Sequence, residues 1–544
     1  MRGGHGGMSR TSGSPDARAE ANPIPGQHAV TEVRELAEAV RAARWEKVDD
    51  LLNERFYTYL LTDREGVHAA FAALPEEWFD AYPRHRMTRE IAFATGSMQL
   101  LNDGVQRGFT DWVLAQESPA ARDRLALHTT QMRTMLATGS YHRAAEKADD
   151  IHELVETATD TNGFHDVLPS VMLRAGQAKL HVGDLSAASG AFMSGHRWAN
   201  SRGTHAADRF IRSHLALVDA LHGDLVLAKA WFHPTDDDEP VGGDGLVHQL
   251  KTADLLIRAL VSVGSDPGDE AEEALRRVSY EHSNNDLWWV GAHARALYEL
   301  QWGEPRRGIA HLEQALRNYR SATAPDLLAG QLLRADLASL YQIANELDAA
   351  ERVLRTPNLS RAHVLVRAAH ARQHLLKGRP SEAAVAIEPP HGGGSGELAP
   401  VTSVLHAVIE HAESGKASER TISRAADHIR SSGALYAVQE AVEPTRGRIL
   451  SRLNVSSSLP RVQYPYNGVI TVDLSQRESE VLAALTRHES VAAIASELHL
   501  STNTVKTYKR SLYRKLGART RAEALEHAAT HGPFEGRSRR SVLE

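Results

Sequence analysis

Cysteine is absent from this chain of 544 residues, and several other features that would define a class of function are absent with it. Without cysteine the chain can form no disulfide, thiolate metal site or cysteine nucleophile, and the composition fits a reducing, cytoplasmic environment. No run approaches the roughly 20 consecutive apolar residues needed to cross a bilayer, so we expect no membrane contact. Residues 1–28 contain Gly, Ser, Pro and Arg without an apolar centre, which predicts a disordered tail rather than a signal peptide.

The residue patterns of common catalytic and cofactor sites are also missing. No Gly-x-x-x-x-Gly-Lys-Ser/Thr loop is present, since Ala417 follows Lys416 where a hydroxyl residue would be needed. His370 and His374 would share one helical face, but no third ligand follows at a suitable spacing, so we expect surface or structural roles for both. We therefore predict no catalytic residue, no metal site and no cofactor, and we do not expect an enzyme.

Charge is distributed unevenly along the chain. The formal net charge is −7. Residues 473–544 carry twelve basic and nine acidic side chains, a net charge of +3, which leaves −10 for the rest. An acidic body with a basic C-terminal segment predicts that only this segment approaches a polyanion such as nucleic acid.

The stretch from Ser501 to Gly517 predicts a tight turn followed by an amphipathic helix. At about 100° per residue, Val505, Leu512 and Leu516 fall in one narrow sector, which we expect to face a core. From Ser501 to Arg521 the chain has seven Lys or Arg and no Asp or Glu. A helix with one buried and one basic stripe suits the major groove of double-stranded DNA. The outer stripe consists of Lys506, Thr507, Lys509, Arg510 and Arg514.

The limits of the C-terminal module are marked by helix-capping residues. Ser475 and Glu478 form a capping box before a first helix with Val481, Leu482 and Leu485 on its apolar side. A second helix carries Ile494, Ala495 and Leu498. Ser501 is placed to cap the basic helix, and Gly517 to end it in a left-handed conformation. Thr520 and Glu523 form a further capping box, which predicts a fourth helix and hence a four-helix helix-turn-helix domain.

These motifs resemble the LuxR-type helix-turn-helix of bacterial transcription regulators. The resemblance covers about 55 residues and rests on Leu474-Ser-x-Arg-Glu478-x-x-Val481-Leu482, Ile494-Ala495-x-x-Leu498, Ser501-x-x-Thr504-Val505-Lys506 and Tyr513-Arg-Lys-Leu-Gly517. It implies that Lys506, Thr507 and Arg510 face the bases. It also implies that the residues near the DNA backbone are Asn503, Thr504, Lys509 and Arg514.

Three positions depart from the family pattern. His488 stands where the family commonly has Gly, Ala493 replaces the usual Glu, and Tyr508 replaces the usual His. The first two affect the start of the second helix more than the reading face. Tyr508 projects to the side of the basic helix, so we expect DNA binding to survive and base preference to be less predictable.

The long middle of the chain predicts repeated helix pairs. A helix, a Gly-type break and a helix with small residues recur at intervals of 44, 40, 80, 42 and 33 residues, and Gly264 to Ala274 supplies a degenerate member within the longest interval. This spacing is near the ~34 residues of tetratricopeptide repeats, so we expect a helical-repeat solenoid with a concave binding surface. The alternative is a spacer or dimerisation rod. The breaks are at Gly139, Gly183, Gly223, Gly303, Asn345 and Gly378.

Two further features of this body bear on its function. Residues 37–89, with Arg44-Trp45-Glu46 and Leu74-Pro75-Glu76-Glu77-Trp78, resemble the start of the repeat domain of large MalT-like LuxR-family regulators, without the phosphate-binding loop of their ATPase domain. Trp288 and Trp289, near His293, are candidates for a ligand pocket. Aromatic residues at helical spacing are more often part of a core, so both readings stay open.

The sequence as a whole predicts an all-α protein. We expect a disordered tail at 1–28, a tetratricopeptide-like helical-repeat domain at 29–454, a linker at 455–472, a LuxR-type helix-turn-helix domain at 473–533 and a tail at 534–544. The predicted function is a DNA-binding transcription regulator, homodimeric on DNA, controlled by an unknown small molecule or protein effector on the repeat domain. The alternative is an interaction scaffold in which DNA binding is secondary.

Overall fold

The computed structural model describes residues 25–94, 101–203, 205–233, 245–278, 286–355, 359, 362–388, 400–453, 464, 474–516, 518, 520–522 and 524–525. Regular structure in these residues is helical throughout, and they contain no strand. Helix α1 begins at Pro25, so the last four residues of the segment predicted as a tail belong to a helix. Among the described residues no helix is both long and apolar enough to span a membrane.

The first five helices share an apolar core, which contains Tyr59, Phe71 and Phe79. The sixth helix packs with the fifth and the seventh in a second, smaller core. Polar caps start two of these helices. At the start of α3, the Asp63 carboxylate accepts a hydrogen bond from Gly66 N at 2.9 Å. At the start of α6, the Asn102 side chain accepts hydrogen bonds from Gly104 N and Val105 N. The helices are α1 (Pro25–Arg41), α2 (Trp45–Thr62), α3 (Arg64–Ala72), α4 (Glu76–Ala81), α5 (Arg84–Phe93) and α6 (Asp103–Leu114).

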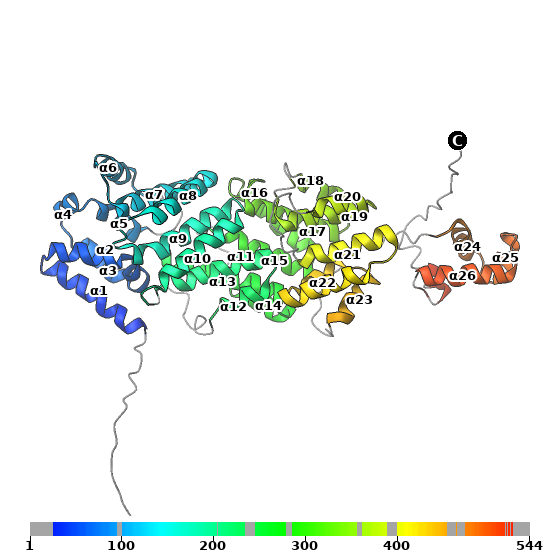
Figure 1. Cartoon of the computed structure of the whole chain (residues 1–544). Coiled ribbons are helices and arrows are strands. Elements are labelled where there is room, and N and C mark those ends of the chain that lie inside the picture. The colour runs from blue at the N-terminus through cyan, green and yellow to red at the C-terminus, as the bar shows by residue number, and fades with distance from the viewer. Residues whose placement is uncertain are drawn as a thin grey trace, which may run out of the picture.

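The next sixteen helices are arranged as consecutive pairs that follow one another along the molecule (Figure 1). The two helices of each pair pack on each other, and from α9 to α21 the first helix of each pair also packs on the first helix of the next. A short 3-10 helix, η4 (Leu435–Glu440), and α23 (Thr445–Leu453) close this body. The pairs are α7 (Ala121–Ala137) with α8 (Tyr141–Thr157), α9 (Phe164–His181) with α10 (Leu185–Ala199), α11 (Asp208–His222) with α12 (Leu225–Ala230), α13 (Gly245–Ser265) with α14 (Gly268–Arg276), α15 (Trp288–Gln301) with α16 (Pro305–Asn318), α17 (Leu328–Ile343) with α18 (Leu347–Val353), α19 (Val364–Leu376) with α20 (Pro380–Ile387), and α21 (Pro400–Ser414) with α22 (Glu419–Ser432).

The predicted Gly-type breaks all fall between the two helices of a pair, so this part of the sequence prediction is confirmed. Gly223 shows why such a residue is needed: it ends α11 at φ +88°, a conformation that residues with a Cβ rarely adopt. Asn345 occupies the same left-handed region at φ +59°, which Asn tolerates better than most residues. Small side chains lie where the paired helices touch, as in Ala144, Ala188 and Ala383, each with no exposed area.

The tryptophan cluster of α15 belongs to the core. Trp289 is 1% exposed, and the ring of Trp288 packs against Tyr319 with centroids 4.3 Å apart. The buried His293 donates or accepts through Nδ1 at 2.6 Å from Asp336 Oδ2. Of the two readings of this cluster, the core is therefore confirmed.

A buried polar network joins three helices near the C-terminal end of the body. The Arg372 guanidinium of α19 forms two hydrogen bonds with the Glu440 carboxylate of η4, at 2.8 and 3.0 Å. Its third nitrogen donates to Ser339 Oγ at 2.7 Å and to Gln342 Oε1 at 2.8 Å, both on α17. All four side chains are buried. The network therefore leaves a buried cation and a buried anion fully bonded.

Tyr464 covers this network from outside the repeat helices. The tyrosine belongs to the segment predicted as a linker. The nearest described residues before and after it in the sequence are Leu453 and Leu474. Its ring lies 4.2 Å from Arg372 Cζ, in cation–π contact, and it is 6% exposed. Burial raises the pKa of the Tyr464 phenol well above its usual value. One residue of the linker is thus held by the body.

We expect the body to lose stability in mild acid because of His214. This residue is 1% exposed; its ring lies 2.7 Å from Phe210 O and 2.8 Å from Gln177 Nε2, and burial lowers its pKa from 6.5 to about 4. Between pH 6.5 and about 4 the unfolded chain binds a proton that the folded chain excludes, so stability falls as pH falls, by on the order of 3 kcal/mol. Urea unfolding of the full chain at several pH values should show a smaller pH slope for His214→Gln. An unchanged slope would remove His214 as the cause.

Candidate nucleic-acid interface

The C-terminal module has a hydrophobic core separate from those of the body. It consists of three described helices, α24 (Gln476–Arg487), α25 (Val491–Glu497) and α26 (Thr502–Leu516). Val505 and Leu512 of α26 are fully buried, as the sequence predicted, and the side chain of Leu516 lies outside the described residues. The other buried members of this core are Leu474, Val481, Leu482, Ala484, Leu485, Ile494, Ala495, Ala518 and Ala524.

The predicted caps start the helices of this module. The Ser475 side chain accepts from Glu478 N at 3.3 Å, and the Glu478 carboxylate accepts from Ser475 N at 2.7 Å, which confirms the capping box. Ser501 Oγ accepts from Thr504 N at 3.1 Å, which confirms the cap of α26. Gly517 and Glu523 lie outside the described residues, although Arg521, Ala522, Ala524 and Leu525 are helical.

A four-residue turn joins α25 to α26. His499 adopts a left-handed backbone conformation with φ +52°. The Leu500 N–H donates to Ala495 O at 2.9 Å, which closes the end of α25 in the manner of a Schellman motif. The turn directs the N-terminus of α26 away from α25 and leaves one side of α26 uncovered.

The uncovered side of α26 carries the residues that the sequence assigned to DNA. Lys506, Thr507 and Arg510 are exposed, as is Asn503, whereas Thr504 and Lys509 are half-buried. Thr504 Oγ1 is hydrogen-bonded to Ser501 Oγ at 2.7 Å, and Thr507 Oγ1 donates to Asn503 O at 3.0 Å. The side chain of Arg514 lies outside the described residues.

The cations of this face are available to an anionic partner. Within the described part of the chain, Lys506 and Arg510 form no hydrogen bond or ion pair. Lys509 lies over the ring of Tyr513, with its Nζ 5.2 Å from the ring centroid. The side of the ammonium group that faces away from the ring can still contact an anion. An exposed row of unpaired cations beside polar side chains provides what phosphate and base contacts require.

One basic residue has a structural role that the sequence did not reveal. The Arg521 guanidinium donates to Leu485 O through two nitrogens, at 3.1 and 2.9 Å, near the C-terminus of α24. A cation there satisfies a carbonyl that the helix leaves free and complements the helix dipole. Arg521 therefore belongs to the scaffold of the module rather than to its basic face.

The departure at His488 also has a structural role. His488 is the C-cap of α24, and its ring contacts the Glu497 carboxylate at the end of α25. Arg487 contacts the same carboxylate, and its hydrogen bond is the first cause that lowers the pKa of Glu497. His488, at the position where Gly is usual, therefore links the C-terminal ends of α24 and α25.

The three helices, the tight turn and the exposed basic face of α26 define a helix-turn-helix domain. The comparisons identify its family: residues 472–528 match the bacterial regulatory proteins of the luxR family, so this segment is a luxR-family helix-turn-helix domain.

The same region is 47% identical over 55 residues to proteins named probable transcriptional regulatory protein NarL, from Mycobacterium tuberculosis strains CDC 1551 / Oshkosh and ATCC 25618 / H37Rv. The matched stretch is 10% of this chain and 26% of each relative. The chain thus spans about a quarter of the length of these curated relatives. The matches concern the C-terminal module, and the resemblance of the body to MalT-like regulators stays an expectation.

Proposed function

We propose that this protein is a transcription regulator that binds double-stranded DNA through α26. The observation that carries the proposal is the uncovered face of this helix in a luxR-family domain, where Lys506 and Arg510 are exposed and pair with no acidic residue that the structure describes. Lys506, Thr507 and Arg510 read base edges in the major groove. The register on the phosphates is set by Asn503, Thr504, Lys509 and Arg514.

The proposal assigns the body a regulatory role and no catalytic step. The consecutive helix pairs from α7 to α22 form a tetratricopeptide-like solenoid, whose concave surface binds a small molecule or a protein. Binding shifts the population between states in which the DNA-binding module is held or released. Two copies of the chain then occupy half-sites about 34–36 Å apart as a homodimer.

Selection of DNA fragments by the full chain, in parallel with residues 473–544, tests this function. Enrichment of one short two-fold motif by both supports the regulator. Enrichment by the isolated module alone would mean that the body holds the module off DNA. If neither enriches a motif, the regulator is ruled out and the interaction scaffold becomes the better description, since the helix pairs form most of the chain.

Replacing Arg510 by alanine should weaken binding to the selected motif by about 1–3 kcal/mol and relax the preference at one base pair. The reason is that a guanidinium facing a base edge discriminates between bases, whereas a phosphate contact does not. Competition binding with a set of single-base variants of the motif measures both effects. Arg477→Ala is the control, because Arg477 lies on α24 and pairs with Glu480 at 2.7 Å. An equal loss on every variant of the motif would place Arg510 at the backbone instead.

A further inference from the structure

A pocket lies between the N-terminal helices and the first helix pairs, far along the chain from the DNA-binding module. Helices α2, α5, α7 and α9 line it, and it encloses about 580 Å³ of space not filled by atoms, part of it open to solvent. The apolar lining consists of Leu52, Phe56, Met87, Ile91, Leu125, Ala126 and Val167.

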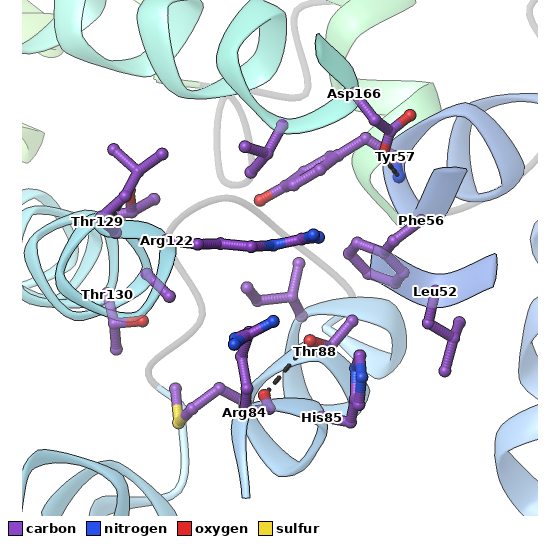
Figure 2. A pocket seen from close by; sticks show the side chains of 15 residues that line it. Leu52, Phe56, Tyr57, Arg84, His85, Thr88, Arg122, Thr129, Thr130 and Asp166 are labelled. Atoms are coloured by element: carbon purple, nitrogen blue, oxygen red, sulfur yellow. Dashed lines mark hydrogen bonds between the residues drawn. The ribbon is translucent and has the colours of Figure 1, made fainter. Parts of the chain in front are cut away.

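Two arginines reach the pocket, and one of them is already neutralised. Arg84 Nε donates to Asp123 Oδ1 at 2.5 Å, and Arg84 Nη1 donates to Asn53 Oδ1 at 2.8 Å. Figure 2 shows Arg122 extending across the pocket between Tyr57 and Arg84. Arg122 forms no hydrogen bond or ion pair in the described part of the chain.

The acidic residue of the pocket does not bind Arg122. Asp166 accepts from the Tyr57 and Thr58 backbone N–H groups at 2.7 and 2.9 Å and from Thr58 Oγ1 at 2.7 Å. His205 Nε2 lies 3.2 Å from the same carboxylate. These donors occupy the Asp166 oxygens, so the Arg122 guanidinium has no acceptor among the residues that the structure describes.

The backbone at Gly163 makes room for this guanidinium. A Cβ at Gly163 would lie 1.8 Å from Arg122 Nη1, so no other residue fits there while Arg122 keeps its position. Burial, and then the charge of Arg84, lower the pKa of Arg122 to about 10, which still leaves it charged at neutral pH. A half-buried cation is thus held beside an apolar wall, and no described Asp or Glu is bonded to it.

We propose that this pocket binds a small monocarboxylic acid, with its carboxylate on Arg122 and its apolar part against Phe56 and Ile91. The planar guanidinium matches a carboxylate through two parallel hydrogen bonds. One unbonded guanidinium calls for one negative charge, which favours a carboxylate over a phosphate. A second cavity shares Tyr57, Ile91, Thr129 and Thr130 with the first. Its lining also includes Arg133 and Arg174, the latter paired with Asp286 at 2.7 Å, so the apolar part is placed in the first cavity.

The role of the acid as an effector rests on the proposed function. Its binding to the pocket does not, because that binding can be measured without DNA. Isothermal titration of the full chain with benzoate, phenylacetate and hexanoate, each beside its uncharged amide, is the first test. At least one acid should bind, and its amide should bind about 10- to 100-fold more weakly, since it cannot form the charge-assisted hydrogen bonds. Phenyl phosphate tests the other anion and should bind more weakly than the best acid.

Arg122→Met should remove the difference between acid and amide, while the ligand-free protein keeps or raises its thermal midpoint because an unbonded half-buried charge is gone. Arg122→Lys should bind acids with an affinity between those of the unchanged chain and Arg122→Met, since lysine keeps the charge without the planar guanidinium. Arg124→Met is the matched control, because Arg124 is exposed on the same helix and does not line the pocket.

Four results would overturn the proposal: no acid binds, the amides bind as well as the acids, Arg122→Met keeps acid binding, or phenyl phosphate binds better than every acid. The comparison of acids with amides needs no variant, so it stands even if a substitution prevents folding. Failure of both the full chain and the isolated module to select DNA would reject the regulator and leave acid binding as measured.

Discussion

Replacing Arg372 by methionine is expected to lower the free energy of unfolding of the C-terminal part of the repeat body by about 3–5 kcal/mol. The loss is large because the substitution leaves the buried Glu440 carboxylate without its two hydrogen-bond donors. Ser339 and Gln342 lose a donor as well, and the Tyr464 ring loses its cation. Urea unfolding of the full chain measures the loss, and hydrogen exchange localises it to α17, α19 and η4.

Two variants separate a buried ion pair from a general effect of losing an arginine. Arg379→Met removes a partner of Glu382 from a pair in which both side chains are more than half exposed, and it should cost less than about 1 kcal/mol. Arg372→Met combined with Glu440→Met removes both charges and should recover much of the stability, because no unpaired charge remains. A double variant as unstable as the single one would contradict the role given to Glu440.

Replacing Leu512 by alanine is expected to unfold the C-terminal module and abolish DNA binding while the body stays folded. Leu512 is fully buried in a small core, and loss of a buried leucine side chain costs about 2–5 kcal/mol. At roughly 0.05–0.15 kcal/mol per residue, a module of this size has only a few kcal/mol of stability to lose. Hydrogen exchange of the full chain should show lost protection in α24–α26 and unchanged protection in α9–α22.

Leu498→Ala is the matched control for this experiment. Leu498 is half-buried at the edge of the same core, so the same chemical change should cost less and leave DNA binding measurable. Retained protection of α26 in Leu512→Ala would mean that Leu512 does not hold the recognition helix on its core. Equal losses in both variants would mean that the depth of burial is not what decides the effect.

The C-terminal module was the most predictable part of the chain because its signals are local. The Ser475–Glu478 capping box and the Ser501 cap each join residues three positions apart, and the spacing of Val505 and Leu512 follows from helix geometry alone. The breaks between paired helices were found for the same reason, since Gly and Asn tolerate the left-handed conformation that five of the six breaks adopt.

The features that the sequence did not reveal depend on residues far apart along the chain. Arg372 and Glu440 are separated by 68 positions, and Tyr57 and Asp166 by 109. No periodicity relates such residues, because the stacking of helix pairs brings them together. The aromatic residues Tyr464 and Tyr466 of the linker were a local sign that this segment has a contact on the body.

The contact of Tyr464 with the body limits the distance between the body and the DNA-binding module. From Tyr464 to Leu474 the chain has ten residues, which reach at most about 35 Å, whereas the full stretch from Leu453 could reach about 70 Å. Halving the length of a tether raises the effective concentration of the module that it carries about threefold. In the proposed homodimer, the contact of Tyr464 would therefore confine each module to a radius near the ~34 Å spacing of DNA half-sites, so the two bodies would have to come close together before both modules reach one operator.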